Sequence, residues 1–216
     1  MFPLAKTLES FFKAKLIKFI VLDILIVLAI ISGFTYFSVS YADSINIDTE
    51  WIKSILKFLT GGFALIVGWF ILPILMPLIA GIFSEMVIKR VEGIYYPNDT
   101  EDKARFWPDM IHDIKFTLYS LFLNIIIIPL YFIGIGFIAS IMLNSYLLGR
   151  EFFESAAGYH LGKPEANKLR KKHNTKIYLS GFALTVMALI PILNLFLPII
   201  AIVWMVHVYH KLKTSR

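Results

Sequence analysis

The sequence contains no cysteine, and charged residues make up only 17% of its 216 positions. Without cysteine, disulfides, cysteine-ligated metals and thiol nucleophiles are excluded. A soluble domain usually has about 25% charged and about 45–50% apolar residues, whereas this chain is 58% hydrophobic. The sequence also lacks a glycine-rich phosphate loop, a nucleophile–base pair and a nucleic-acid motif. We therefore expect neither a soluble enzyme nor a nucleic-acid-binding protein, and no cofactor.

Long apolar runs point instead to an all-α integral membrane protein. Residues 19–40 and 58–83 are each long enough to cross a hydrocarbon core of about 30 Å as one helix. The first run is too long for a signal peptide, and no small-residue cleavage site follows it. Pro73 and Pro77 lie inside the second run and are expected to kink or break that helix.

Two later apolar segments, 116–148 and 177–209, differ from simple spans. Each is too long for one helix of about 20 residues and too short for two spans joined by a turn. Residues that interrupt helices lie near the middle of each segment: Pro129, Gly134 and Gly136, then Pro191, Asn194 and Pro198. The pattern predicts helical hairpins that enter the bilayer, turn inside protein and leave by the same face. The predicted fold is a single membrane domain with two transmembrane helices and two proline-broken, hemi-penetrating hairpins.

The distribution of charge predicts the orientation in the membrane. Residues 1–18 are lysine-rich and amphipathic, as expected for a cytoplasmic segment at the membrane interface. The loop 41–50 is acidic and has no lysine or arginine, so it is predicted to lie outside. Segment 84–115 carries both signs and the connector 149–176 is basic, so both are placed in the cytoplasm. Both termini are then cytoplasmic, and the net charge of +6 reflects topology rather than nucleic-acid binding.

Arg150, Glu151 and Glu154 form the sharpest charged cluster, at the edge of an apolar segment where unpaired charges are costly. Arg150 and Glu154 are spaced to share one helix face. One interpretation is an interfacial ion pair. The other is a guanidinium that binds sulfate or phosphate oxygens, restrained by the carboxylates when the site is empty. Arg170 lies in a basic run expected at anionic headgroups, and it is a further candidate for the supporting ion pairs.

Other polar residues also allow two interpretations. Asn194 is either a cap at the tip of the second hairpin or a polar group that faces a transport path. His112 with Asp113, and His207 with His210, lack a third metal ligand at usable spacing. We therefore predict no metal site. The first pair should lie on a solvated face, and the two histidines of the last helix at the membrane interface.

The second half of the chain carries a recognisable series of motifs. They are 146–154 (YLLGREFFE), His160, Glu165-Ala166, Leu169-Arg170, His173, Ile190-Pro191, Asn194-Leu195, Pro198, 205–207 (MVH) and His210. On these residues, and on 78–92 before them, the chain resembles the CysZ-type sulfate permease family, which shares a superfamily with the etoposide-induced protein of eukaryotes. The variant is similar to an alphaproteobacterial branch. The resemblance implies a bacterial inner-membrane protein with two spanning helices, two hemi-penetrating hairpins and a tendency to form homo-oligomers.

The resemblance also implies a substrate. Bacterial members of the family are tied to sulfate uptake for cysteine synthesis, and a Gly-Leu-Arg element at their first membrane helix is linked to sulfate. The corresponding stretch here is Lys15-Leu16-Ile17-Lys18, so Lys18 joins Arg150 and Asn194 as a candidate anion ligand. The predicted function is a permease for a small oxyanion, foremost sulfate, with membrane lipids and further copies of the chain as partners. The alternative is a non-transporting structural or envelope protein of the same family.

Overall fold

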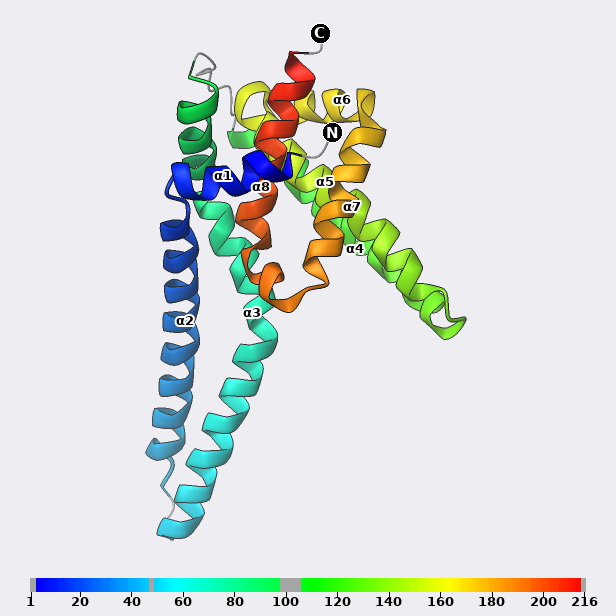
Figure 1. The fold of residues 1–216 in the computed structure, drawn as a ribbon. Coiled ribbons are helices and arrows are strands. Elements are labelled where there is room, and N and C mark those ends of the chain that lie inside the picture. The colour runs from blue at the N-terminus through cyan, green and yellow to red at the C-terminus, as the bar shows by residue number, and fades with distance from the viewer. Residues whose placement is uncertain (1–2, 47–48, 98–105, 215–216) are drawn as a thin grey trace. The chain divides into compact units, whose positions relative to one another are not determined.

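The computed structural model describes residues 3–46, 49–97 and 106–214, and within them all regular structure is helical (Figure 1). The helices are α1 Leu4–Lys13, α2 Ile17–Ser44, α3 Glu50–Tyr95, α4 Phe106–Phe132, α5 Gly136–Leu161, α6 Lys163–Lys172, α7 Asn174–Ala188 and α8 Pro191–Lys213. They form two compact units, one of Ile17–Phe83 and one of Met1–Leu16 with Ser84–Arg216. We call them the α2–α3 unit and the C-terminal unit, and the last part of α3 belongs to the second.

In the α2–α3 unit the two helices run antiparallel and come close together where Gly68 faces Ile31. A Cβ on Gly68 would lie 2.7 Å from the side chain of Ile31, so glycine allows a close approach there. Near the connecting loop, the Asp43 carboxylate lies 3.1 Å from Nζ of Lys53 and 2.6 Å from Nζ of Lys57. The two predicted spanning segments are therefore helical, and α3 is helical through Pro73 and Pro77, where the sequence suggested a kink or a break.

The core of the C-terminal unit is α8. Every side chain from 201 to 210 is buried, including Trp204, and α8 packs against α1, α5 and α7. The short amphipathic helix α1 crosses α8 in Figure 1 and contacts it. The N-terminal segment that was expected in the membrane interface is thus helical and covers part of the last helix.

Both later apolar segments contain a helix break near the middle. Between α4 and α5 the chain turns at Gly134, whose φ of 82° is favourable only for glycine. Between α7 and α8 it turns at Leu189 and Ile190, and Pro191 occupies the first turn of α8, where its missing N–H costs nothing. Pro129 and Pro198, by contrast, lie inside α4 and α8 without ending them. The interruptions arise from the glycine turn and from one proline.

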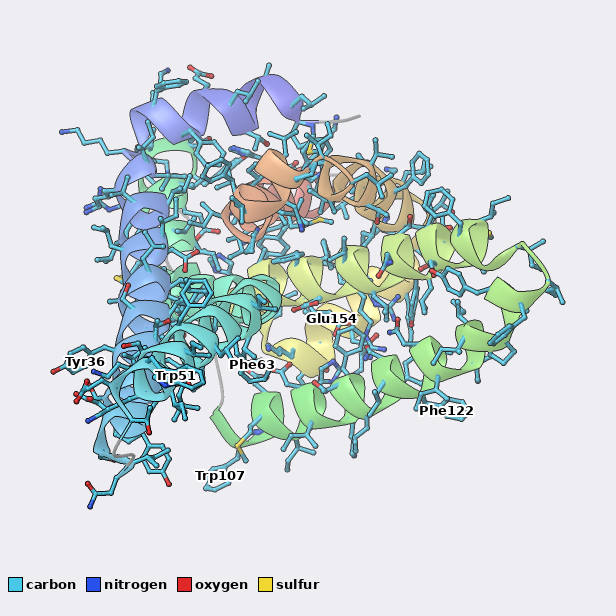
Figure 2. The ribbon with its side chains drawn as sticks, turned by 90° about the horizontal axis from the view of Figure 1, so that it is seen from below. Tyr36, Trp51, Phe63, Trp107, Phe122 and Glu154 are labelled. Atoms are coloured by element: carbon cyan, nitrogen blue, oxygen red, sulfur yellow. The ribbon has the colours of Figure 1, made fainter. Side chains whose placement is uncertain are left out.

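Among the described residues, four segments are long and apolar enough to cross a membrane: Ile17–Ser44, Glu50–Gly68, Trp107–Phe132 and Leu193–Lys213. Three of them expose most of their side chains, whereas Leu193–Lys213 is largely buried within the protein. Figure 2 shows Trp107 and Phe122 on the outer side of α4 and Tyr36, Trp51 and Phe63 in the α2–α3 unit, and all five are more than half exposed. Apolar surface of this extent is typical of helices that face lipid.

Helices α5 and α7 make the closest backbone approach in the C-terminal unit. A Cβ on Gly181 would lie 1.9 Å from the carbonyl oxygen of Ser145 and 2.7 Å from the amide nitrogen of Gly149. A Cβ on Gly149 would lie 2.8 Å from the carbonyl oxygen of Ile177. Small residues spaced a helical turn apart let membrane helices approach in this way. The approach fixes α5, which carries Arg150, Glu154 and His160, against α7.

Gly181→Ala should therefore destabilise the protein, because the added methyl meets backbone atoms that cannot move away. Overpacking usually costs about 1–3 kcal/mol, and this contact should reach the upper end of that range. Gly93→Ala is the matched control, since a Cβ there has no neighbour within 4 Å. Thermal unfolding of the purified protein in detergent should show a clear loss for Gly181→Ala and no loss for Gly93→Ala. Equal melting temperatures would contradict the close crossing.

Candidate functional site: two buried carboxylates and their basic partners

The carboxylate of Glu154 on α5 binds three basic side chains from three helices. Nε of Arg150 donates to both carboxylate oxygens at 3.1 and 3.3 Å, and Nε of Arg170 on α6 donates to Oε1 at 2.9 Å. Nε2 of His112 on α4 lies 2.7 Å from Oε2. Figure 2 shows Glu154 pointing into the space between helices rather than outward. We call these four residues the Glu154 cluster.

Both arginines of the Glu154 cluster are positioned by further contacts. The Arg150 guanidinium lies over the ring of Phe116, with its carbon 4.3 Å from the ring centre. Arg170 also donates to the side-chain oxygen of Asn167 at 3.0 Å and lies 5.5 Å from the ring centre of Tyr146. The side chains of Glu154 and Arg170 are only 4% and 6% exposed. Two guanidinium charges thus face one carboxylate in a largely dry environment, which leaves an excess of positive charge.

This cluster contains some of the residues predicted from the sequence. The predicted Arg150–Glu154 pair is present, and Arg170 joins it as a direct partner of Glu154. Glu151 is exposed on the same helix, and its carbonyl oxygen accepts a hydrogen bond from the hydroxyl of Ser155. His112 was expected on a solvated face, and that expectation is wrong because its imidazole is bonded to the buried carboxylate.

Lys18 and Asn194 were also predicted as anion ligands. Lys18 belongs to the α2–α3 unit, where it is exposed and lies over the ring of Phe19 at 4.9 Å. Asn194 is exposed in the first turn of α8, and its backbone N–H donates to the carbonyl oxygen of Ile190. The helix begins before Asn194, because Pro191 already occupies its first turn.

A second buried carboxylate, Glu92 near the end of α3, binds two histidines through one oxygen. Oε1 of Glu92 lies 2.7 Å from Nε2 of His160 on α5 and 2.7 Å from Nε2 of His210 on α8. All three side chains are buried. Burial by itself raises the pKa of Glu92, but the hydrogen bonds and positive charge of the two histidines outweigh it and hold this pKa below its usual range. We call Glu92, His160 and His210 the Glu92 trio.

A chain of hydrogen bonds lies beside the trio and joins α1 to α8. The hydroxyl of Ser10 is 2.9 Å from Nε2 of His207, and the hydroxyl of Tyr96 is 3.0 Å from Nδ1 of the same ring. The Tyr96 ring stacks on His210 with 3.7 Å between ring centres. Burial, and next the charge of Glu92, raise the pKa of Tyr96, so its hydroxyl stays protonated at neutral pH. His207 and His210, which were expected at the membrane interface, are both buried in the core of this unit.

Two cavities of the C-terminal unit differ in the sign of the charge on the residues that line them. One of about 740 Å³ has three carboxylates in its wall, those of Glu85, Asp109 and Asp113, against the single lysine Lys163. The other, of about 440 Å³, is lined by the basic side chains of Lys6 and Lys211, by Tyr96, and by the imidazoles of His207 and His210. The second cavity is the better match for an anion, and it adjoins the Glu92 trio through His210.

Sequence reasoning missed the Glu92 trio and the part played by His112. Glu92, His160 and His210 are far apart along the chain, so no local spacing links them. The sequence held one weak indication of the trio. Each of the three residues is near the C-terminal end of a long helix, and helix ends at the same side of a protein can be in contact. The Arg150–Glu154 pair could be predicted because it is formed within one helix.

The fold and the buried ionic clusters define a helical membrane protein whose C-terminal unit encloses basic groups around two carboxylates. A family model described as "Sulfate transporter CysZ/Etoposide-induced protein 2.4" matches residues 4–198, and the chain belongs to this family. The comparison with curated proteins and the comparison with solved structures each gave no match. The family assignment agrees with the resemblance seen in the sequence.

Removal of the Glu154 carboxylate should destabilise the protein strongly. Glu154→Gln leaves two guanidiniums partly buried without an anion, and breaking a buried ion pair from one side costs about 3–5 kcal/mol. The control is Glu165→Gln on α6, because the Glu165–Lys168 pair is exposed and such pairs contribute little. Thermal or denaturant unfolding in detergent should show a large loss for the first variant only. Similar losses for both variants would argue against the buried cluster.

Proposed function

We propose that the protein is a membrane permease for a small oxyanion, foremost sulfate. The observation that carries the proposal is the Glu154 cluster, in which one buried carboxylate faces the guanidiniums of Arg150 and Arg170. A buried excess of positive charge favours an anion, and the planar fork of arginine matches two oxygens of sulfate. Membership of a family described as a sulfate transporter supports the same substrate class.

The proposed mechanism is an exchange of partners at Arg150. Without substrate, Arg150 donates to Glu154, which keeps the guanidinium in place. An oxyanion would take over the donors of Arg150, while Arg170 still neutralises Glu154 and His112 stays hydrogen-bonded to it. Arg150 is the more exposed of the two arginines, at 12% against 6%, so it is the one an ion would reach first. Lys18 and Asn194 stay proposed as further anion ligands.

The basic cavity of about 440 Å³ supports the proposal independently. Its lining by Lys6 and Lys211 provides positive charge and hydrogen-bond donors to a hydrated anion. The acidic wall of the larger cavity would repel the same ion.

A second candidate function is a non-transporting structural protein of the membrane. One observation favours it: both oxygens of Glu154 are already bonded, and Arg170 is held by Asn167 as well. In this second function, the cluster has a purely structural role, which is to join α4, α5 and α6. The two functions differ in whether the unmodified protein takes up sulfate and whether that uptake requires Arg150.

We propose the following arrangement in the membrane. The α2–α3 unit spans the bilayer, and the helix pairs α4–α5 and α7–α8 are hairpins that penetrate it from the cytoplasmic face. The breaks at Gly134 and before Pro191, and the basic residues of α6, support this arrangement. The expected setting is a bacterial inner membrane with both termini in the cytoplasm, and a homo-oligomer in which lipid and other copies cover the exposed apolar faces.

Sulfate uptake into liposomes that contain the purified protein tests the transport proposal. Arg150→Lys keeps the charge but loses the bidentate fork, so uptake should fall by about tenfold or more while insertion is retained. Arg150→Ala should abolish uptake. The double variant Arg150→Ala with Glu154→Ala should not regain uptake, and it should remain less stable than the unmodified protein, because the buried Arg170 guanidinium loses its carboxylate.

Full uptake by Arg150→Ala would contradict a role of Arg150 in anion binding, because Glu154 keeps Arg170 as a partner in that variant. Absence of sulfate uptake by the unmodified protein would favour the structural function. Lys168→Ala is the matched control, because it removes a cation from an exposed pair on α6. Its uptake and its melting temperature should both equal those of the unmodified protein.

The topology can be tested with single cysteines, because the chain has none of its own. Cysteines at Ser155 and Asn174 should react with a membrane-impermeant maleimide from the cytoplasmic side, and one at Ser44 from the outside. A cysteine at Ile133, in the turn between α4 and α5, should react from neither side. Labelling of position 174 from the outside would contradict two hairpins that return to the cytoplasm.

A further inference from the structure

We propose that the Glu92 trio binds one divalent ion of the zinc class, through Oε1 of Glu92 and Nε2 of His160 and His210. The three ligand atoms lie within 4.8 Å of one another, and all three residues are buried. They come from three helices, α3, α5 and α8, and converge on one point in the C-terminal unit. The proposal is independent of anion transport.

The chemistry of the ligand set selects the ion. Two imidazoles and one carboxylate are a usual set for zinc with an open fourth position, whereas calcium and magnesium prefer oxygen ligands alone. Zinc bonds of about 2.0–2.2 Å in a tetrahedral site place neighbouring ligand atoms roughly 3.3 Å apart. The two N–O distances of 2.7 Å are hydrogen bonds, so a bound ion requires the rings to move outward by roughly 0.6 Å.

The surroundings provide an entry path and a position for a fourth ligand. His210 lines the basic cavity of about 440 Å³, so an ion can reach the trio from that side. Lys6 and Lys211 in the cavity wall favour an anionic fourth ligand such as hydroxide, and the Glu92 carboxylate offsets their repulsion of the metal ion.

His207 is close to the trio in sequence and lines the same cavity, but it is not part of the proposed site. Its two ring nitrogens are occupied by the hydroxyls of Ser10 and Tyr96. His207 is therefore a suitable control for the metal titration, because it is a buried histidine on the same helix as His210 but is not a proposed zinc ligand.

The test is a metal titration of the full chain in detergent, purified through a tag without histidine and treated with a chelator. Cobalt, a visible stand-in for zinc, should bind at about one ion per chain with the absorption of a tetrahedral site, and zinc should displace it. Zinc should also raise the melting temperature, because it joins three helices. His160→Gln and Glu92→Gln should each weaken binding by at least about 100-fold, and His207→Gln should bind as the unmodified protein does.

His210→Cys keeps the proposal testable if the other variants fail to fold. A thiolate is also a zinc and cobalt ligand, so this variant should still bind cobalt and should gain a thiolate-to-cobalt absorption band in the near ultraviolet. The chain has no other cysteine that could produce that band.

Two results would overturn the proposal. The first is the absence of saturable cobalt binding in the unmodified protein, which would leave the trio as a hydrogen-bonded network only. The second is binding that persists in Glu92→Gln and His160→Gln, or a His210→Cys variant that binds cobalt without the thiolate band, because the ion would then lie elsewhere.

Discussion

The packing of helices in the C-terminal unit depends on one constraint: a buried carboxylate must have basic partners. An ionised carboxylate that loses its water is stable inside a protein only when charge and hydrogen bonds replace that water. Glu154 obtains them from α4, α5 and α6, and Glu92 from α5 and α8. Helix α5 takes part in both clusters, so the two carboxylates tie the remaining helices to it.

This constraint explains why charged residues can follow a membrane-length apolar segment without a loop. Helix α5 runs from Gly136 through Gly149 to Leu161, and Glu154 and His160 in its second half bind residues of other helices. The backbone contact between Gly149 and Gly181 brings α7 close on another side of α5. The apolar side chains of α4, by contrast, face outward, as a membrane environment requires.

The apolar pattern and the prolines predicted the helical class, the two long antiparallel helices and a break in each later apolar segment. These features arise from local preferences, since glycine and proline restrict the backbone wherever they stand. The Arg150–Glu154 pair was predictable for the same reason, because both residues lie on one helix face. Not every local signal had the expected effect: Pro129 and Pro198 stay within helices.

The contacts of Glu92 could not be read from the sequence, because they join residues separated by 68 and 118 positions. The same is true of His112, which meets Glu154 across 42 positions. Such pairs depend on how helices pack, and a single histidine in an apolar helix gives no sign of its partner. The predicted ligands Lys18 and Asn194 illustrate the converse: a plausible residue type does not reveal whether its side chain is exposed.

The claim that buried carboxylates join distant helices is tested most directly by a double-mutant cycle on Glu154 and Arg170. Unfolding free energies of the unmodified protein, Glu154→Gln, Arg170→Gln and the double variant isolate the energy of that pair. We predict a coupling of about 1–3 kcal/mol, against less than about 0.5 kcal/mol for the exposed Glu165–Lys168 pair measured in the same way. Additive effects of the two substitutions at Glu154 and Arg170 would contradict the account.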